Sequence, residues 1–210
     1  MKLLDCPQWV TDENSALPGI AQGASAFMRF SNRQNPKKYL LTHGDIKEWH
    51  KKLFLKTVTV PYYAGNYRSI DPARPCLNTD VHIGGVFGAP VADVEQLMKK
   101  FSEELERATK STDEYLASER SPVERIKAAA YLAAFAGGKI IQIHPFVNGN
   151  GRMARMVMDF FLHRYLNRMP FFIDRPTHPD YTTASRLAMQ HGLFGPLYQY
   201  LVETIIMLDT

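Results

Sequence analysis

The sequence predicts a mainly α fold, a helical bundle that carries one small β-hairpin. Two observations lead to this fold class. Apolar residues recur at helical spacing in long segments after residue 90, and strand-type alternation is confined to residues 79–87. With 210 residues, 45% of them hydrophobic, the chain can bury one sizeable core. We therefore expect a single globular domain over residues 1–210.

The first part of the chain is predicted to be irregular. Turn-forming residues dominate and periodicity is weak, which indicates a lead-in over residues 1–40. A short helix is expected over residues 45–55, followed by extended chain over residues 57–63, where β-branched residues cluster. Residues 65–90 are expected to be mostly loop. Within them, alternation on both sides of a Gly-Gly pair predicts the β-hairpin.

Two long helices are predicted next. Apolar residues at helical spacing indicate an amphipathic helix from about Val91 to Ala108. Ser121 and Glu124 form a capping box with proline at the first helical position, so a second helix is expected from Pro122 to about residue 143. Small residues dominate this second helix and permit close approach of its neighbours. We therefore expect it to be the central helix of the bundle.

Three further helices complete the predicted bundle. One begins at Gly151, because no helix breaker interrupts the sequence between that residue and Pro170. Residues 181–191 form the next helix, which Gly192 ends. A last helix starts at Gly195 and runs to about residue 207.

Residues 144–155 combine a histidine, a glycine-flanked turn and two arginines. The turn at residues 149–151 can place successive N–H groups around an anion, and the helix that follows turns its positive end toward it. Arg152 and Arg155 are three positions apart, so both guanidinium groups can reach a polyphosphate near the helix start. The imidazole of His144 can accept a proton from an attacking hydroxyl. The pattern predicts a phosphate-transfer site.

The same segment resembles the Fic motif. Its fixed positions are matched by His144, Phe146, Gly149, Asn150, Gly151, Arg152 and Arg155, and Asn148 stands where the motif is usually acidic. The similarity extends outward through residues 63–68, residues 81–90 and the helix leading into the motif, over roughly two-thirds of the chain. The chain is identified as a member of the Fic family (Fic/DOC type). The resemblance implies a Fic-type helical bundle with a hairpin flap, its core over residues 57–208.

The resemblance also implies an activity. Fic-type protein adenylyltransferases transfer AMP from ATP to a Ser, Thr or Tyr hydroxyl of a target protein and release pyrophosphate. By this likeness His144 is the catalytic base, and the nucleotide phosphates are bound by Gly149, Asn150, Gly151, Arg152 and Arg155. Phe146 is expected to support the loop. Target recognition by strand addition is expected at the flap residues Val81, His82, Ile83 and Gly84.

The implied co-substrate is ATP and the implied cofactor is Mg²⁺. Family members place Asp or Glu at the position of Asn148 to hold the ion, and an amide oxygen is a poorer ligand, so weaker metal affinity is expected. Two alternatives stay open. One is another Fic-type transfer, of phosphate, a different nucleotide or phosphocholine, although family phosphotransferases carry lysine where Gly151 stands. The other is a non-catalytic nucleotide- or protein-binding module weakened at Asn148.

The expected regulation also follows from the resemblance. Many Fic proteins carry an inhibitory helix with the pattern Ser/Thr-x-x-x-Glu-Gly/Asn, whose glutamate pairs with the second arginine of the motif. Ser102 and Glu106 have this spacing, but Arg107 follows them, so we count the pattern as absent. We expect the chain to be unrestrained, or inhibited by a separate antitoxin-like protein that supplies the glutamate to Arg155. The target protein and the oligomeric state are not specified by the sequence.

Charge and cysteine content bear on partners and location. The net charge is +4, but the basic residues are scattered among 21 acids, which argues against nucleic-acid binding. We find no signal peptide and no stretch approaching the ~20 apolar residues that span a bilayer, so we expect a soluble protein. Cys6 and Cys76 lie far apart in a chain large enough not to need stapling, which argues against a disulfide. We expect a cytoplasmic protein in a reducing compartment, or a translocated effector.

Overall fold

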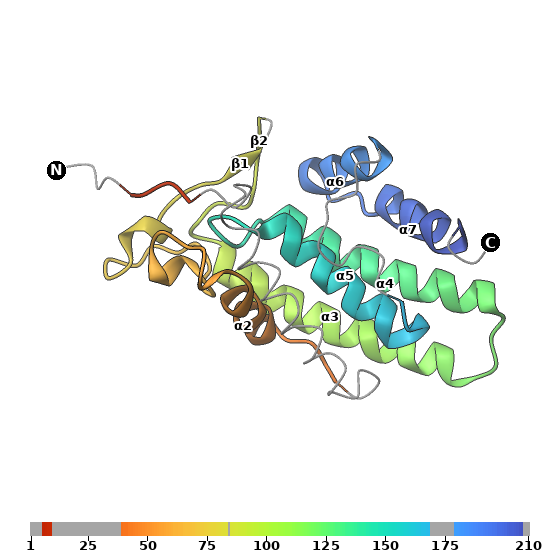
Figure 1. Cartoon of the computed structure of the whole chain (residues 1–210). Coiled ribbons are helices and arrows are strands. Elements are labelled where there is room, and N and C mark those ends of the chain that lie inside the picture. Colours follow the sequence, from red (N-terminus) through yellow and green to blue (C-terminus); the bar gives the residue numbers. More distant parts are fainter. Residues whose placement is uncertain (1–5, 10–38, 84, 169–178, 208–210) are drawn as a thin grey trace.

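The computed structural model describes residues 6–9, 39–83, 85–168 and 179–207 (Figure 1). Within these residues six α-helices surround a common core, and a two-stranded hairpin projects from one end. The elements are α2 (His43–Phe54), η2 (Pro61–Tyr63), η3 (Pro75–Leu77), β1 (His82–Ile83), β2 (Val86–Phe87), α3 (Val94–Ala117), α4 (Pro122–Ile143), α5 (Asn150–Leu166), α6 (Pro179–His191) and α7 (Gly195–Met207). The predicted mainly α bundle with one hairpin is confirmed.

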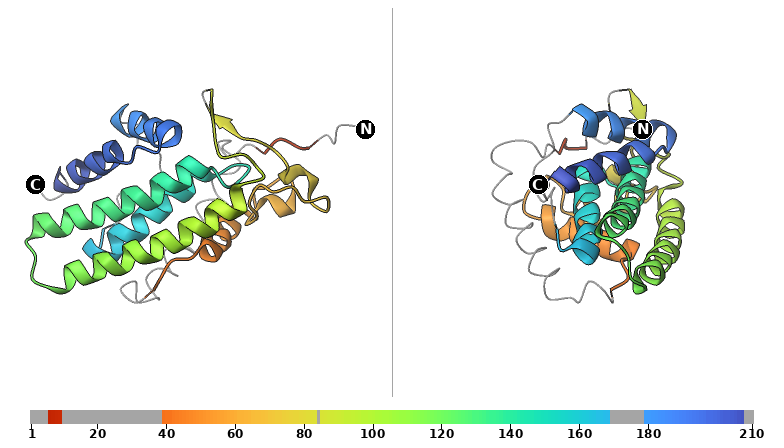
Figure 2. Two further views of the ribbon diagram at one scale, coloured as in Figure 1. Left: turned by 180° about the vertical axis from the view of Figure 1, so that it is seen from behind. Right: turned by 90° about the vertical axis from the view of Figure 1, so that its right-hand side faces the viewer.

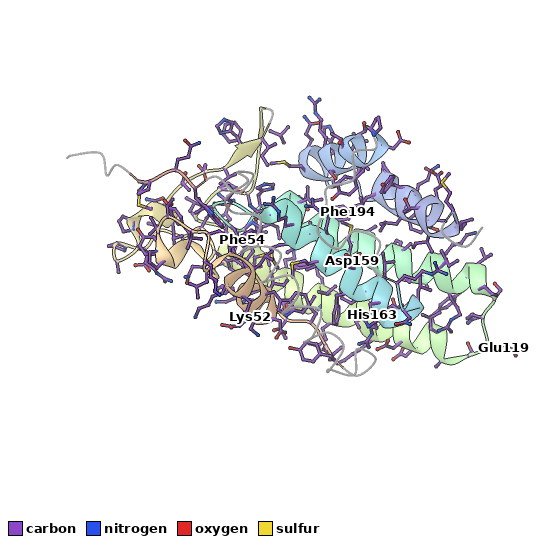
Figure 3. The ribbon with its side chains drawn as sticks, in the orientation of Figure 1. Lys52, Phe54, Glu119, Asp159, His163 and Phe194 are labelled. Carbon is purple, nitrogen blue, oxygen red and sulfur yellow. A yellow bond between two sulfur atoms is a disulfide. The ribbon has the colours of Figure 1, made fainter. Side chains whose placement is uncertain are left out.

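Helix α4 is the central helix of the bundle, as predicted. It packs against α3, α5, α6 and α7, and both views in Figure 2 show it enclosed by them. Its small residues permit this enclosure. A Cβ atom added at Gly137 would lie 2.5 Å from Cγ of Met158 on α5, and one added at Gly138 would lie 2.4 Å from Cδ1 of Phe194, which precedes α7 and is labelled in Figure 3. The predicted capping box of Ser121 and Glu124 is also formed.

Helix α3 is longer than expected, because it continues nine residues beyond Ala108 to Ala117. No glycine or proline interrupts this part of the chain, and Glu106 pairs with Lys110 one turn later at 2.7 Å. Beyond that pair, Asp113 accepts hydrogen bonds from Arg164 and Tyr165 of α5, at 2.6 and 2.8 Å. These contacts with α5 stabilise the last turns, and the periodicity of α3 alone does not reveal them.

The segment before the hairpin differs from the expected extended chain. Residues 61–63 form the 3₁₀ turn η2, in which the N–H of Tyr63 donates to the carbonyl of Val60 at 2.9 Å. Proline at the first position of η2 fixes φ in the range that a helical turn requires, so it starts a turn where β-branched residues suggested a strand. Val60 itself is extended, with φ −123° and ψ 122°.

The hairpin forms within the predicted residues. β1 and β2 pair antiparallel, with His82 opposite Phe87 and Ile83 opposite Val86. Gly85, in the turn between them, has φ +81°, a conformation that favours glycine. Gly84 lies outside the described residues. Ile83 and Phe87 are both more than half exposed, so the hairpin presents apolar side chains to solvent.

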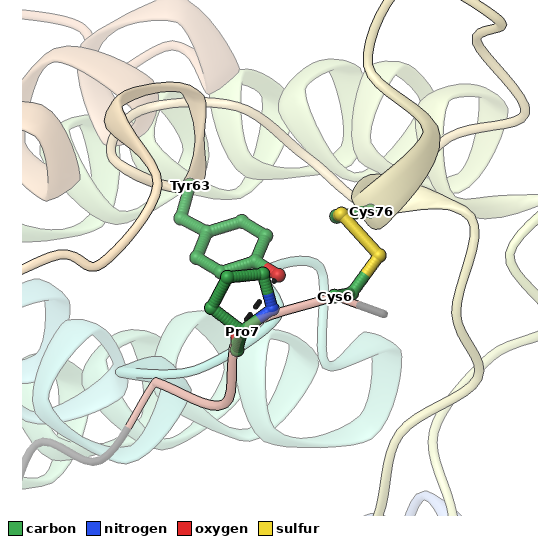
Figure 4. Close-up of a disulfide and its surroundings, with 4 residues drawn as sticks. All are labelled: Cys6, Pro7, Tyr63 and Cys76. Atoms are coloured by element: carbon green, nitrogen blue, oxygen red, sulfur yellow. Dashed lines mark hydrogen bonds between the residues drawn. A yellow bond between two sulfur atoms is a disulfide. The ribbon is translucent and has the colours of Figure 1, made fainter. Parts of the chain in front are cut away.

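The two cysteines are joined, so the expectation that they stay unpaired is wrong (Figure 4). Turn η3 carries Cys76 next to the short segment of residues 6–9, a proximity that a separation of 70 residues could not reveal. The hydroxyl of Tyr63 donates to the carbonyl of Pro7 at 3.2 Å beside the disulfide. The expected reducing compartment rested on unpaired cysteines and loses that support. The rest of the predicted lead-in lies outside the described residues up to residue 38.

One helix in the described part of the chain, α4, is long and apolar enough to cross a membrane by length and composition. The expectation that no segment approaches this limit is therefore wrong. The cause is the role of α4 in the bundle: four other helices cover it, so its residues can be apolar on most sides.

The close contact at Gly137 leads to a stability prediction. Gly137→Val places two methyl groups where Met158 and the carbonyl of Ala154 already lie, so we expect the free energy of unfolding to fall by about 1–3 kcal/mol through overpacking. Lys127→Val, on an exposed position of the same helix, is the matched control. Urea unfolding of both variants tests this, and equal stabilities would show that α5 can move away without cost.

Candidate active site

His144 ends helix α4 in a left-handed conformation, with φ 53° and ψ 58°. Its side chain is only 5% exposed, and Nδ1 lies 2.8 Å from the carbonyl oxygen of Ile141. Because a carbonyl only accepts hydrogen bonds, Nδ1 carries the proton and Nε2 of the neutral ring is the proton acceptor. Burial lowers the pKa of His144; the bond to Ile141 raises it, and the positive charge of Arg68 lowers it further. The neutral base is therefore favoured at pH 7.

Arg68 connects the end of α4 to the base of the hairpin, a role that the sequence did not reveal. Its side chain is fully buried. The guanidinium donates to the carbonyls of His144 at 2.8 Å and Ile143 at 3.1 Å. It also donates to the carbonyls of Thr79 at 3.1 Å and Ala89 at 2.8 Å, which flank the two strands. A single side chain thus fixes the catalytic candidate and the flap relative to each other.

Gly88 brings the flap into direct contact with His144. The N–H of Gly88 donates to Val81 across the base of the hairpin at 2.9 Å, and the next N–H, of Ala89, donates to Ile143 at 3.1 Å. A Cβ atom added at Gly88 would lie only 2.6 Å from Cβ of His144. Of the predicted flap residues, His82 and Ile83 are exposed, and Val81 is partly exposed. Glycine at position 88 is therefore the sequence feature that marks this close approach.

The turn after His144 has the conformation expected of an anion-binding loop. Gly149 has φ +81°, and a Cβ atom there would lie 2.5 Å from Cε2 of Phe54, which Figure 3 labels on α2. The first hydrogen bond of α5 runs from the N–H of Met153 to the carbonyl of Gly149 at 3.0 Å. The N–H groups of residues 150–152 consequently have no acceptor within the helix. Together with the helix dipole they provide a site for a phosphate group.

Asn150 and Phe146 hold this loop closed from inside. The side-chain oxygen of Asn150 accepts from the N–H of Phe146 at 2.9 Å, and its amide nitrogen donates to the carbonyl of the same residue at 2.8 Å. The ring of Phe146 is fully buried and stacks on His50, with 3.6 Å between the ring centroids. Asn150 was expected to bind phosphate. Both ends of its side chain are hydrogen-bonded to Phe146, so only its backbone N–H is left for the expected phosphate contact.

His50 is a second residue that the sequence did not reveal, because it is isolated among charged residues of α2. Its Nδ1 accepts from the N–H of Gly65 at 2.9 Å, so Nε2 carries the proton and donates to the carbonyl of Asn148 at 3.1 Å. The ring is fully buried, and burial lowers its pKa to about 3, although the bond to Asn148 acts in the opposite direction. His50 is therefore a neutral structural support beneath the loop.

Asn148 makes hydrogen bonds within the protein through both ends of its side chain. Its Oδ1 accepts from the N–H of Gly149 at 2.6 Å, and its Nδ2 donates to the carbonyl of Trp9 at 2.7 Å. The oxygen expected to contact a metal is thus already hydrogen-bonded, and so is one N–H expected to contact phosphate. Among the described residues no group of three or more His, Cys, Asp or Glu side chains could hold a metal ion. These residues do not fit a magnesium site built by the protein.

The two arginines lie on the first turns of α5. Arg155 is 6% exposed and Arg152 is partly exposed. A Cβ atom added at Gly151 would lie 3.6 Å from Nη1 of Arg155, so this guanidinium lies beside the start of the helix. The Ser102–Glu106 pair lies in the middle of α3. Ser102 accepts a hydrogen bond from the N–H of His43 at the start of α2 at 3.1 Å, and Glu106 pairs with Lys110 at 2.7 Å, so both side chains make contacts within the bundle or on α3 itself.

Comparisons with known proteins give one consistent result. A family model described as Fic/DOC family matches residues 40–162. A protein adenylyltransferase Fic from Drosophila grimshawi is 28% identical over 181 residues, which cover 86% of this chain and 32% of the relative. The corresponding protein from Drosophila melanogaster is also 28% identical, over 86% of this chain and 31% of its own length. The chain thus spans about a third of the length of the curated relatives it matches.

Solved structures share the fold. Fic-1 from C. elegans superimposes with a TM-score of 0.62 at 22% identity, covering 95% of this chain and 52% of that one. The N-terminal Fic domain of a cell filamentation protein from Bartonella quintana, solved with bound ADP, has a TM-score of 0.62 at 21% identity. It covers 89% of this chain and 82% of its own. The predicted Fic-type bundle is therefore confirmed.

Removing the guanidinium of Arg68 should destabilise the fold. In Arg68→Met, the carbonyls of residues 79, 89, 143 and 144 lose their donor, and we expect a loss of about 3 kcal/mol or more in the free energy of unfolding. The control is Arg74→Met, in the same connecting segment, because Arg74 is only partly buried and pairs with Asp71. Chemical denaturation compares the two. A loss below about 1 kcal/mol in Arg68→Met would contradict the central role of this residue.

The buried histidines predict a pH dependence of stability. Both pKa values are lowered in the folded state, so the unfolded chain binds more protons below pH 6.5 and stability falls as the pH falls. For His50 the loss continues toward its folded pKa of about 3. Its contribution to the slope is at most about 1.4 kcal/mol per pH unit.

The test is urea unfolding at pH 7, 6, 5 and 4. His50→Gln should give a flatter dependence on pH than the wild type, and His191→Gln, which alters an exposed histidine, is the control substitution. Parallel curves for the wild type and His50→Gln would mean that folding does not change proton binding by His50, which would contradict its lowered pKa. The comparison uses slopes, because His50→Gln also changes the stability at pH 7.

Proposed function

Because this chain belongs to the Fic/DOC family, we propose that it is a protein adenylyltransferase. It transfers AMP from ATP to a Ser, Thr or Tyr hydroxyl of a target protein and releases pyrophosphate. One observation carries the proposal: the Nδ1 proton of His144 is donated to the carbonyl of Ile141, so Nε2 is left as a base, and α5, whose start is the proposed phosphate site, begins at Asn150 on the other side of the loop. The relatives named as protein adenylyltransferases support the same activity.

The proposed transfer uses groups that the site already contains. Nε2 of His144 takes the proton of the target hydroxyl as its oxygen attacks the α-phosphorus of ATP. A new phosphorus–oxygen bond forms, the bond to the β-phosphate oxygen breaks, and pyrophosphate leaves. The first-turn N–H groups of α5 and the guanidinium of Arg152 stabilise the charge on the phosphates, and Arg155 binds the far phosphates. Burial lowers the pKa of His144, and the positive charge of Arg68 acts in the same direction, so the ring readily gives up the proton before the next cycle.

Magnesium enters this proposal only as a companion of the nucleotide. The ion keeps several waters and binds substrate phosphates readily, so it can arrive with ATP without a carboxylate at position 148. When bound, it neutralises phosphate charge. The side chain of Asn148 is bonded to Gly149 and Trp9, which agrees with a metal held mainly by ATP.

The partners are also proposed. The target is a protein whose extended segment pairs with the flap at residues 81–84 and presents a hydroxyl to His144. The Ser102–Glu106 pair lies in mid-α3, so regulation by a separate protein that offers a glutamate to Arg155 fits better than restraint from that pair. Action in the cytoplasm, or in another cell after translocation, is part of the same proposal.

A second candidate function is a non-catalytic nucleotide- or protein-binding module. Asn148 favours it, because the acid usual at this position is missing and the amide is used to hold the loop. Such a module would bind ATP without transferring any part of it. Direct labelling separates the two candidates.

The test uses purified chain, magnesium, a cell lysate and ATP labelled at either the α- or the γ-phosphate. We expect protein labelling from the α-position only. His144→Ala should reduce it by about 10²–10⁴-fold through loss of the general base, while His191→Ala, at the exposed end of α6, should label like the wild type. Mass spectrometry of the labelled band identifies the target and the adduct.

Other outcomes count against the proposal in different ways. Label from the γ-position would indicate phosphotransfer. An adduct of another mass would indicate another Fic-type transfer. Nucleotide binding by calorimetry, together with no label dependent on His144 in several lysates, would favour the non-catalytic module.

A further inference from the structure

We propose that Trp9 and Asn148 are positioning residues of the phosphate-binding loop, and that the Cys6–Cys76 disulfide holds them in place. Residues 6–9 are called the N-terminal strap below. The strap runs from the disulfide to the loop between α4 and α5, and the transfer site therefore responds to reduction. This inference rests on the proposed function for its effect on activity, although its structural part can be tested alone.

The strap is attached at three points. Its first residue, Cys6, is bonded to Cys76, and the hydroxyl of Tyr63 donates to the carbonyl of Pro7 at 3.2 Å (Figure 4). Its last residue, Trp9, is 5% exposed although it lies far in sequence from the core helices. The Trp9 ring stacks on Tyr63 at 6.1 Å between centroids. A four-residue segment with this many attachments has a defined position.

Trp9 packs on the same aromatic rings as the loop. Its ring meets Phe54 edge-on at 5.2 Å and His50 edge-on at 5.8 Å. Phe54 is the ring against which the backbone of Gly149 packs, and His50 donates to the carbonyl of Asn148. The strap and the loop therefore pack against the same two rings, so displacement of Trp9 removes one contact from Phe54 and one from His50.

Asn148 joins the strap to the loop directly. Its Nδ2 donates to the carbonyl of Trp9, and its Oδ1 accepts from the N–H of Gly149. An amide can do both, whereas an ionised carboxylate cannot, because the carbonyl of Trp9 requires a donor and the carboxylate has none. An acid at this position, as the family usually has, would place negative charge against that carbonyl oxygen. Asparagine at position 148 is therefore suited to joining the loop to the strap.

Reduction releases the strap by ordinary thiol–disulfide exchange. A dithiol reductant attacks one sulfur of the pair, and the Cys6–Cys76 bond breaks. At the end both cysteines carry thiols and the reductant is a disulfide, so two electrons and two protons have moved to the protein. The Tyr63 hydrogen bond and the Trp9 packing then hold the strap without its covalent attachment. We therefore expect the phosphate-binding loop to unfold locally more often after reduction, while local unfolding of the helices in the bundle stays the same.

Hydrogen exchange of the nucleotide-free chain tests the structural part. With reductant, amides of residues 146–153 should exchange at least about tenfold faster, and amides in the middle of α3 should not change. The double variant Cys6→Ser with Cys76→Ser should show the fast rates with or without reductant. Asn148→Asp should also show them while oxidised, whereas Asn78→Asp, an exposed position with the same charge change, should resemble the wild type.

A fluorescent ATP analogue tests the effect on the site. If reduction lowers the competent fraction of the loop to about a tenth, the apparent Kd rises about tenfold. Equal loop exchange in both redox states, or exchange that rises equally in α3, would overturn the inference. Failure of the analogue to bind in either state would instead count against the proposed function, and the exchange rates would still decide the role of the strap.

Discussion

The buried guanidinium of Arg68 is the interaction on which the site depends. A helix leaves its last carbonyls without partners and carries partial negative charge there. Arg68 supplies donors to the carbonyls of Ile143 and His144 and adds a full positive charge at that end. Its remaining donors reach the two ends of the hairpin. One side chain thereby completes α4, orients His144 and fixes the flap.

Amide side chains perform a similar task in the loop. Asn150 binds both backbone groups of Phe146, and Asn148 binds Gly149 and Trp9. Each amide offers a donor and an acceptor at once, so the loop satisfies its buried polar groups without any charged side chain of its own. The first-turn N–H groups of α5 have no acceptor within the helix, and the proposed phosphate binding uses these groups.

Sequence patterns predicted the helix starts and turns that depend on residues close together in the chain. The capping box of Ser121 gave the start of α4, and the glycines around Asn150 located the turn and the start of α5. Contacts between distant segments were missed. Arg68 is one arginine among many in the sequence, and only the folded chain brings it to residues 75 and 76 positions away. The disulfide, His50 and the last turns of α3 were missed for the same reason.

The glycine at position 88 has a mechanical consequence. At that point no side chain separates the backbone of the hairpin from the β-carbon of His144. Interior packing is stiff, and neighbouring groups in contact move together. A displacement of the hairpin is therefore expected to displace His144 as well, because no flexible side chain lies between them. A protein that binds the exposed side chains of Ile83 and Phe87 on the hairpin would thereby also affect the position of His144.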